Sequence, residues 1–156
     1  MFEMAAGILN YDSAYLLEFD AEYENATIIN TYIKDIDVTT NPFYTGTKFK
    51  TADFPEVKPL ITQNQPILCE DVTNVLDNEA ENQRDFFASR GINSFYALPI
   101  TAGEKPYGFF IVEYIEKSDT NFTESRLNFL RIIANILGDT RKKVLYEERI
   151  YNYAYF

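Results

Sequence analysis

Hydrophobic and polar residues follow a strand-like pattern most clearly in the stretch 94–115. We expect one strand at Phe95–Ile100 and a second at Tyr107–Ile115, joined by a turn that contains glycine, proline and charges. Both faces of these strands are apolar, which is typical of central strands that are covered above and below. The alternation in the second strand sets Phe109, Ile111 and Ile115 against Phe110, Val112 and Tyr114. Glu113 is the one charge inside this run. The pattern therefore places this hairpin at the middle of the fold.

The rest of the chain predicts shorter elements around the hairpin. Further strands are expected at Ser13–Phe19, Ala26–Ile33 and Pro66–Asp71. Helices are expected at Phe2–Leu9, within Thr51–Asn64, from Asn78 to the residues before Gly91, and from Thr123 to the end. Pro59 is expected to kink or limit the second of these helices, and Lys34–Lys50 is expected to be loop with some extended structure.

The final helix has an apolar face that narrows along its length. Around Leu130 the face is broad and suits packing on a domain, whereas beyond Gly138 only a narrow stripe remains. Such a change predicts a helix that leaves its domain and pairs with another helix in a homodimer. The candidate dimer residues are Leu130, Ala134, Leu137, Val144 and Tyr151. Arg141 and Glu148 fall in the same stripe, so we expect the pairing to be weak.

Length and charge limit the partners of the chain. The 156 residues indicate one domain, and an apolar fraction of 46% is enough for a core. The formal charge is −10 and is carried by the residues before Thr123, which argues against nucleic acid and anionic membranes. No apolar run is long enough to span a membrane. A single cysteine, Cys69, favours a reducing compartment, so a cytoplasmic location is expected.

The chain contains no histidine, and this excludes most of the common catalytic arrangements. Serine–histidine and cysteine–histidine pairs are impossible, and the commonest metal ligand is missing. There is also no glycine-rich loop suited to phosphates. We therefore expect no catalytic residues, no metal and no cofactor in this chain.

The order of the elements resembles the GAF domain, and four short stretches carry the resemblance. They are the helix and strand from Pro55 to Asp71, Gly91-Ile92-Asn93-Ser94 followed by Leu98-Pro99-Ile100, Gly108-Phe109-Phe110, and Phe122-Thr123 before the last helix. The resemblance implies an α+β, profilin-like fold. Such a fold has a central antiparallel sheet of about five to six strands, helices on both faces and a long C-terminal signalling helix.

The last residues, Glu148–Phe156, resemble the linker that enters a GGDEF diguanylate cyclase domain. This second resemblance implies a sensory domain at residues 1–137 and a linker helix at 138–156 that leads to an output domain outside this sequence. The full-length protein would then be a diguanylate cyclase in bacterial cyclic-di-GMP signalling.

The GAF resemblance also implies a small-molecule pocket. Its candidate residues are Phe54, Cys69, Asp71, Phe86, Phe87, Ser94, Tyr96 and Leu98. The apolar members are equally suited to a core, and Asp71 to a strand end that faces water. Bilin-binding relatives follow their cysteine with histidine, whereas Cys69 precedes Glu70, so a buried structural cysteine is favoured. Cyclic-nucleotide-binding relatives carry acidic residues where Ser125 and Arg126 stand here, which argues against cyclic nucleotide binding.

Two main hypotheses follow, and an enzyme is a weak third. In the first, a non-catalytic sensory domain binds an unidentified small molecule and controls a covalently linked output domain through a dimeric C-terminal helix. In the second, a degenerate GAF fold is only a dimerisation spacer, and its own aromatic side chains fill the pocket.

Overall fold

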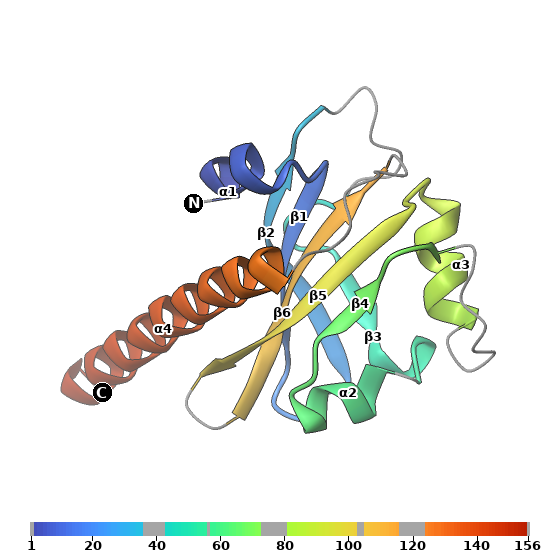
Figure 1. Ribbon diagram of the computed structural model, residues 1–156. Helices are drawn as coiled ribbons and strands as arrows, with labels where there is room; N and C mark the ends of the chain where they lie inside the picture. The colour runs from blue at the N-terminus through green and yellow to red at the C-terminus, as the bar shows by residue number, and fades with distance from the viewer. Residues whose placement is uncertain are drawn as a thin grey trace.

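The computed structural model describes residues 2–35, 43–55, 57–72, 81–102, 105–115 and 124–155. The strands are β1 (Ser13–Phe19), β2 (Asn25–Ile33), β3 (Lys48–Lys50), β4 (Ile67–Cys69), β5 (Ser94–Ala102) and β6 (Lys105–Tyr114). They form one six-stranded antiparallel sheet in the order β3-β2-β1-β6-β5-β4 (Figure 1). The helices are α1 (Phe2–Leu9), the 3-10 turn η1 (Thr51–Asp53), α2 (Val57–Gln63), α3 (Glu81–Ser89) and α4 (Glu124–Tyr155). The expected α+β fold with a long C-terminal helix is confirmed.

The predicted central hairpin consists of β5 and β6. Its register pairs Ser94 with Tyr114 at one end and Ala102 with Lys105 at the other. On its other side β6 pairs with β1, which places Ser13 opposite Glu113. Thus β6 and β1 occupy the two middle positions of the sheet, which explains why β6 is apolar on both faces.

Gly108 allows β6 and β1 to approach each other closely. It lies opposite Glu18 in the sheet, beside the point where the pairing of β1 with β2 shifts register at Leu16 and Leu17. A Cβ atom added to Gly108 would lie 1.8 Å from the carbonyl oxygen of Leu17. A glycine at the start of this strand is therefore a steric requirement.

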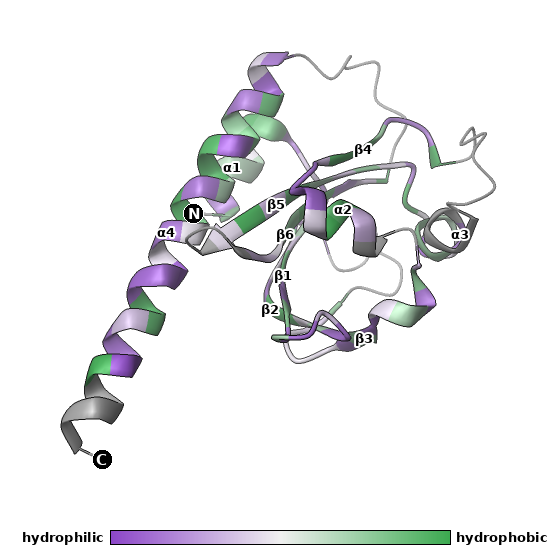
Figure 2. Cartoon of the chain, turned by 90° about the horizontal axis from the view of Figure 1, so that it is seen from below, coloured by the Kyte–Doolittle hydropathy of each residue, from purple (hydrophilic) through white to green (hydrophobic). Residues whose placement is uncertain are grey.

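Helices cover both faces of the sheet (Figures 1 and 2). On one face α1 and α4 pack against a cluster that includes Leu98, Phe110, Val112 and Tyr114. On the other face lie α2 and α3, over two smaller clusters that include Phe109 and Phe87. The side chains of β6 therefore alternate as predicted. From Phe109 on, its odd-numbered residues face α2 and α3, and its even-numbered residues face α1 and α4.

The first half of α4 packs on the sheet, and its second half projects away from it (Figure 1). Leu130, Ile133 and Ala134 are buried, whereas the helix is largely exposed beyond Gly138. A Cβ atom on Gly138 would lie 2.6 Å from the carbonyl oxygen of Thr101, so the helix backbone touches the end of β5 there. The part of the chain that the structure describes has no helix that is both long and apolar enough to cross a bilayer.

These positions correct the expected dimer stripe. Leu130 and Ala134 lie against the sheet and are not available to a second helix, and Leu137 is partly buried beside them. Arg141, expected as a polar position in the stripe, forms an ion pair with Glu18, with Nη2 3.2 Å from Oε1. Val144 is exposed. The side chain of Tyr151 lies outside the described residues.

The extended structure expected within Lys34–Lys50 is found as β3, which pairs with the start of β2 through Lys50 and Asn25. One local prediction differs from the structure. Pro59 does not limit α2, because the helix begins at Val57 and a first-turn proline loses no intrahelical hydrogen bond. The predicted caps at Asn78 and Thr123 lie outside the described residues.

Candidate functional site

A cavity of about 90 Å³ lies between one face of the sheet and a cover that includes α3 and η1. Its floor is formed by β1, β2, β5 and β6, and its lining is almost entirely apolar. The floor residues are Tyr15, Leu17, Phe19, Ala26, Ile28, Phe95, Ala97, Phe109, Ile111 and Glu113. The residues around and above it are Phe43, Phe49, Lys50, Thr51, Phe54, Ile67, Phe86 and Phe87.

Phe86 is at the centre of the aromatic wall of this cavity. Its ring stacks on Phe43 with centroids 5.4 Å apart and planes at 17°. The rings of Phe49, Phe54 and Phe87 meet it edge to face at 5.0–5.7 Å. Edge-to-face pairs of this kind add to the energy of burial, so Phe86 attaches α3 to the wall together with Phe87, whose ring stacks on Phe95 with centroids 3.8 Å apart.

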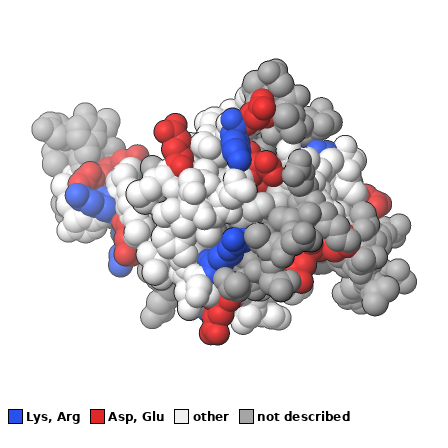
Figure 3. All heavy atoms as spheres, turned by 45° about the horizontal axis from the view of Figure 1, so that its top comes forward, with Lys and Arg blue, Asp and Glu red and all other residues white. Residues whose placement is uncertain are grey.

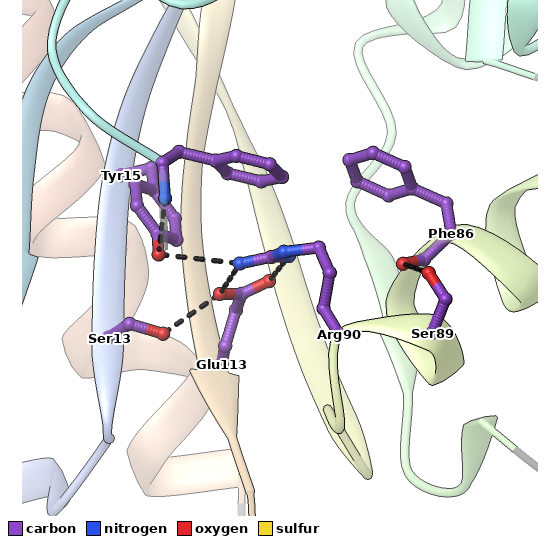
Figure 4. Close-up of polar contacts among 7 residues, drawn as sticks. Ser13, Tyr15, Phe86, Ser89, Arg90 and Glu113 are labelled. Carbon is purple, nitrogen blue, oxygen red and sulfur yellow. Dashed lines mark hydrogen bonds and ion pairs between the residues drawn. The ribbon is translucent and has the colours of Figure 1, made fainter. Parts of the chain in front are cut away.

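A buried ion pair lies beside the cavity, which its carboxylate partner Glu113 lines. Arg90, just after α3, donates from Nη1 and Nη2 to the two carboxylate oxygens of Glu113, at 2.5 and 2.9 Å (Figure 4). The side chains are 5% and 0% exposed. Ser13 Oγ donates a further hydrogen bond to Glu113 Oε1 at 2.8 Å. Charges taken out of water are tolerated only when hydrogen bonds satisfy them in this way.

Two aromatic residues complete the surroundings of Arg90. Its guanidinium carbon lies 3.7 Å from the ring centroid of Phe43, in cation–π geometry. Arg90 Nη2 also lies 3.4 Å from the hydroxyl oxygen of Tyr15, which accepts the bond. Burial, and then the charge of Glu113, raise the pKa of Tyr15, so this hydroxyl stays neutral.

Three of the predicted pocket residues line the cavity: Phe54, Phe86 and Phe87. Ser94, Tyr96 and Leu98 do not. Tyr96 and Leu98 belong to the cluster beneath α1 and α4, and Ser94 shares their face because side chains alternate along β5. The cavity residues of β5 are their neighbours Phe95 and Ala97.

Cys69 and Asp71 also lie outside the cavity lining. Cys69 is half-buried at the edge of the sheet and packs against the cluster of Val72 and Phe87. Burial is the main cause that raises the pKa of its thiol, which disfavours the reactive thiolate. The position of Cys69 therefore agrees with the structural role favoured above.

The prediction missed the lining residues Tyr15, Phe43, Phe109 and Glu113, and it missed Arg90, the buried partner of Glu113. Glu113 had a visible signal, since a lone charge within a run that is apolar on both faces needs a buried partner. It shares a face of β6 with Phe109 and Ile111, and the structure shows that this face lines the cavity. Arg90 had no such signal, because an arginine at the end of a helix is ordinary on a surface.

No group of potential metal ligands occurs among the described residues. Acidic and basic side chains are scattered over the face in Figure 3, and the described residues form no continuous basic patch there. The site is thus an apolar cavity with one internally paired charge.

Comparison with known proteins agrees with this architecture. The model of the GAF domain family matches residues 2–140. The chain belongs to the GAF domain family. No curated protein sequence matches it significantly.

Solved GAF structures share the fold at low sequence identity. A phycocyanobilin-bound GAF domain from a cyanobacterial phytochrome has a TM-score of 0.76 at 16% identity, over 92% of this chain and 81% of that one. The blue-light-absorbing PixJ GAF domain of Thermosynechococcus elongatus has a TM-score of 0.76 at 12% identity, over 96% and 85%. A domain assigned to a two-component sensor histidine kinase of Sinorhizobium meliloti 1021 has a TM-score of 0.64 at 21% identity, over 94% and 91%.

Proposed function

We propose that this GAF domain is a non-catalytic sensor that binds a small apolar molecule in the cavity beneath α3. The observation that carries the proposal is the aromatic lining, with eight phenylalanines around a space that also borders Glu113, the buried partner of Arg90. An apolar cavity with a few placed polar groups is the usual form of a small-molecule site.

The size of the cavity limits the ligand. Drug-sized ligands occupy about 300–1,000 Å³, and an engineered cavity of about 150 Å³ binds benzene. At about 90 Å³ this cavity suits a molecule no larger than a small aromatic ring, unless Phe86 moves. Because Phe86 connects α3 to the wall, occupancy that displaces its ring would also shift α3 and Arg90.

A bilin, the ligand of the phytochrome neighbour, does not fit the residues of this chain. A linear tetrapyrrole needs several times the volume of this cavity. Cys69 lies outside the lining, with a thiol pKa raised by burial. Light sensing through a bilin is therefore not part of the proposal.

The proposed output runs through α4 in a homodimer. The helix packs on the opposite face of β5 and β6 from the cavity, so these two strands separate input from output. Its projecting half suits a linker, and the GGDEF-like stretch at its end supports a diguanylate cyclase as the linked domain. The full-length protein would then act in cyclic-di-GMP signalling.

The small volume also favours the second candidate, a spacer whose cavity is filled by its own phenylalanines. Under that function no ligand binds, and the domain contributes only its fold and its dimer.

A thermal-shift screen with small aromatic and aliphatic compounds, together with mass spectrometry of co-purified molecules, separates the two. Phe109 and Phe110 are adjacent, buried and on opposite faces of β6, so Phe109→Leu and Phe110→Leu form a matched pair. A sensor predicts that Phe109→Leu alone changes the shift produced by a compound. Equal responses in both variants would argue against binding in the cavity, and no shift with any compound would favour the spacer.

A further inference from the structure

The face of α4 that points away from the sheet carries a regular exposed stripe. Its apolar members are Ile132, Ile136, Tyr146 and Ile150, which are 44–63% exposed. Asp139 and Lys143, both exposed, lie between them on the same face. These six residues, here called the α4 seam, follow a 4-3-4-3-4 spacing, which is the spacing of a coiled-coil interface.

The seam differs from the stripe predicted from sequence. Leu130 and Ala134 lie on the opposite side of the helix and are buried against the sheet. At 3.6 residues per turn, the seam residues lie about half a turn from them. No described element of the domain covers the seam, as the exposure of its apolar members shows.

We propose that the α4 seam pairs antiparallel with the seam of a second copy of this chain. The order of residues in the seam is self-complementary about the level of Arg141. In an antiparallel pair, Asp139 faces Lys143 of its partner, Ile136 faces Tyr146, and Ile132 faces Ile150. Every layer then joins two apolar residues or two opposite charges.

A parallel pair of the same seam is less favourable. It would place Asp139 beside Asp139 and Lys143 beside Lys143 at two interior layers, where like charges repel most strongly. Asp139 and Lys143 form no ion pair within the described residues, so both charges are open to a partner. Lys142 opposes this preference, because it would face its own copy in the antiparallel pair and Glu147 in the parallel one. Because Lys142 flanks the seam, solvent and salt screen its charge more than the charges of Asp139 and Lys143 inside the seam.

The antiparallel pair deepens the proposed function, on whose α4 dimer it rests. The two helices would lie side by side, each projecting half against the domain-bound half of the other. Residue 155 of each copy would then be roughly 20 Å from the axis, on opposite sides. Output domains that must meet to react would be held apart, so this dimer is the inactive arrangement.

Disulfide trapping tests the orientation. In a Cys69→Ser background, Ile136→Cys and Tyr146→Cys are prepared as separate single variants, with Leu145→Cys as an exposed position outside the seam. The antiparallel pair predicts that an equimolar mixture of the first two cross-links at least tenfold more than either alone. Leu145→Cys should not cross-link under the same conditions. Cross-linking of each single variant with itself would overturn the orientation and leave the α4 dimer of the proposed function standing.

Substitutions that neutralise Asp139 and Lys143 give an independent test, because the antiparallel and the parallel pair predict opposite changes in self-association. Sedimentation at low ionic strength compares the full chain with Asp139→Asn/Lys143→Gln. The antiparallel pair predicts weaker self-association in this variant, and recovery in the swapped pair Asp139→Lys/Lys143→Asp. Stronger self-association on neutralisation would overturn the proposal. A chain that stays monomeric at every concentration and forms no cross-links would overturn both the α4 seam and the α4 dimer. That result would leave ligand binding in the cavity untouched, because the thermal-shift screen measures it separately.

Discussion

Arg90 and Glu113 form a bidentate ion pair inside the domain, with Nη1 2.5 Å from Oε2 and Nη2 2.9 Å from Oε1. The two residues come from the end of α3 and from the central strand β6. The pair therefore holds the segment that follows α3 against the floor of the sheet, at the boundary of the cavity.

Removing one partner of this pair should destabilise the domain strongly. Arg90→Met leaves an uncompensated buried carboxylate, which costs about 3–5 kcal/mol of unfolding free energy. The matched control is Arg141→Met, because the Arg141–Glu18 pair is 29% and 23% exposed. That control should lose about 1 kcal/mol or less. Urea unfolding of both variants checks the difference, and equal losses would contradict the structural weight given to the buried pair.

The double variant Arg90→Met/Glu113→Leu should recover most of the stability lost in Arg90→Met. With both charges absent, no buried group remains without a partner, and apolar residues fill a similar volume. Ser13 Oγ loses its acceptor in this variant, so the recovery should be incomplete. A double variant that is less stable than Arg90→Met would show that the charge left behind is not the cause.

Gly108→Ala should lower the unfolding free energy by about 3 kcal/mol or more, because the added methyl group meets the backbone of Leu17. Gly7→Ala is the control within α1, where an added Cβ atom has no neighbour within 4 Å. Alanine is the better helix former, so Gly7→Ala should raise the stability by about 0.5–1 kcal/mol. Thermal unfolding measures both shifts, and a neutral Gly108→Ala would contradict the close approach of β1 and β6.

Gly138→Ala should loosen α4 without unfolding the sheet. The new methyl group would lie 2.6 Å from Thr101 O and 3.2 Å from a methyl carbon of Ile100, so the helix must move away from β5. Hydrogen exchange should then increase in α4 and at the end of β5 more than in β1 and β2. Unchanged protection of α4 would show that the contact at Gly138 does not hold the helix.

The domain should lose stability as the pH rises above about 10. Burial is the largest cause that raises the pKa of both Tyr96 and Tyr114 to about 12; the charge of Glu70 is the next cause for Tyr96, and the interaction with Tyr96 is the next for Tyr114. Their rings lie 5.9 Å apart, and Tyr114 donates to the carbonyl oxygen of Leu9. The unfolded chain releases these protons near pH 10, whereas the folded chain keeps them. Each group therefore stabilises the fold below pH 10 and loses that effect between about pH 10 and 12.

Urea midpoints measured across this pH range check the prediction. Tyr114→Phe should lower stability at neutral pH through the lost hydrogen bond to Leu9, and flatten the decline in stability above pH 10. An equally steep decline in the variant would show that Tyr114 does not contribute to it.

Local pattern predicted the elements well, whereas the cavity residues came from the resemblance to the GAF domain and were only partly right. Of those residues, Phe54, Phe86 and Phe87 line the cavity. Ser94, Tyr96 and Leu98 were placed on the wrong face, because β5 is apolar on both sides and alternation does not say which side meets α3. The same ambiguity placed the dimer stripe of α4 on residues that the sheet buries, such as Leu130 and Ala134.

The sequence by itself determined the antiparallel GAF fold, the central hairpin, the absence of histidine chemistry and the projecting C-terminal helix. The fold was implied by the resemblance of four short stretches to the GAF domain, whereas the hairpin, the helix and the missing histidine follow from short-range periodicity and composition. Only the tertiary structure decided which face of β6 meets the cavity, and that Glu113 is neutralised there by Arg90, with Ser13 as a hydrogen-bond donor 100 positions away. The physical reason is that a buried charge and a covered face are defined by what packs against them, and those partners are distant in sequence.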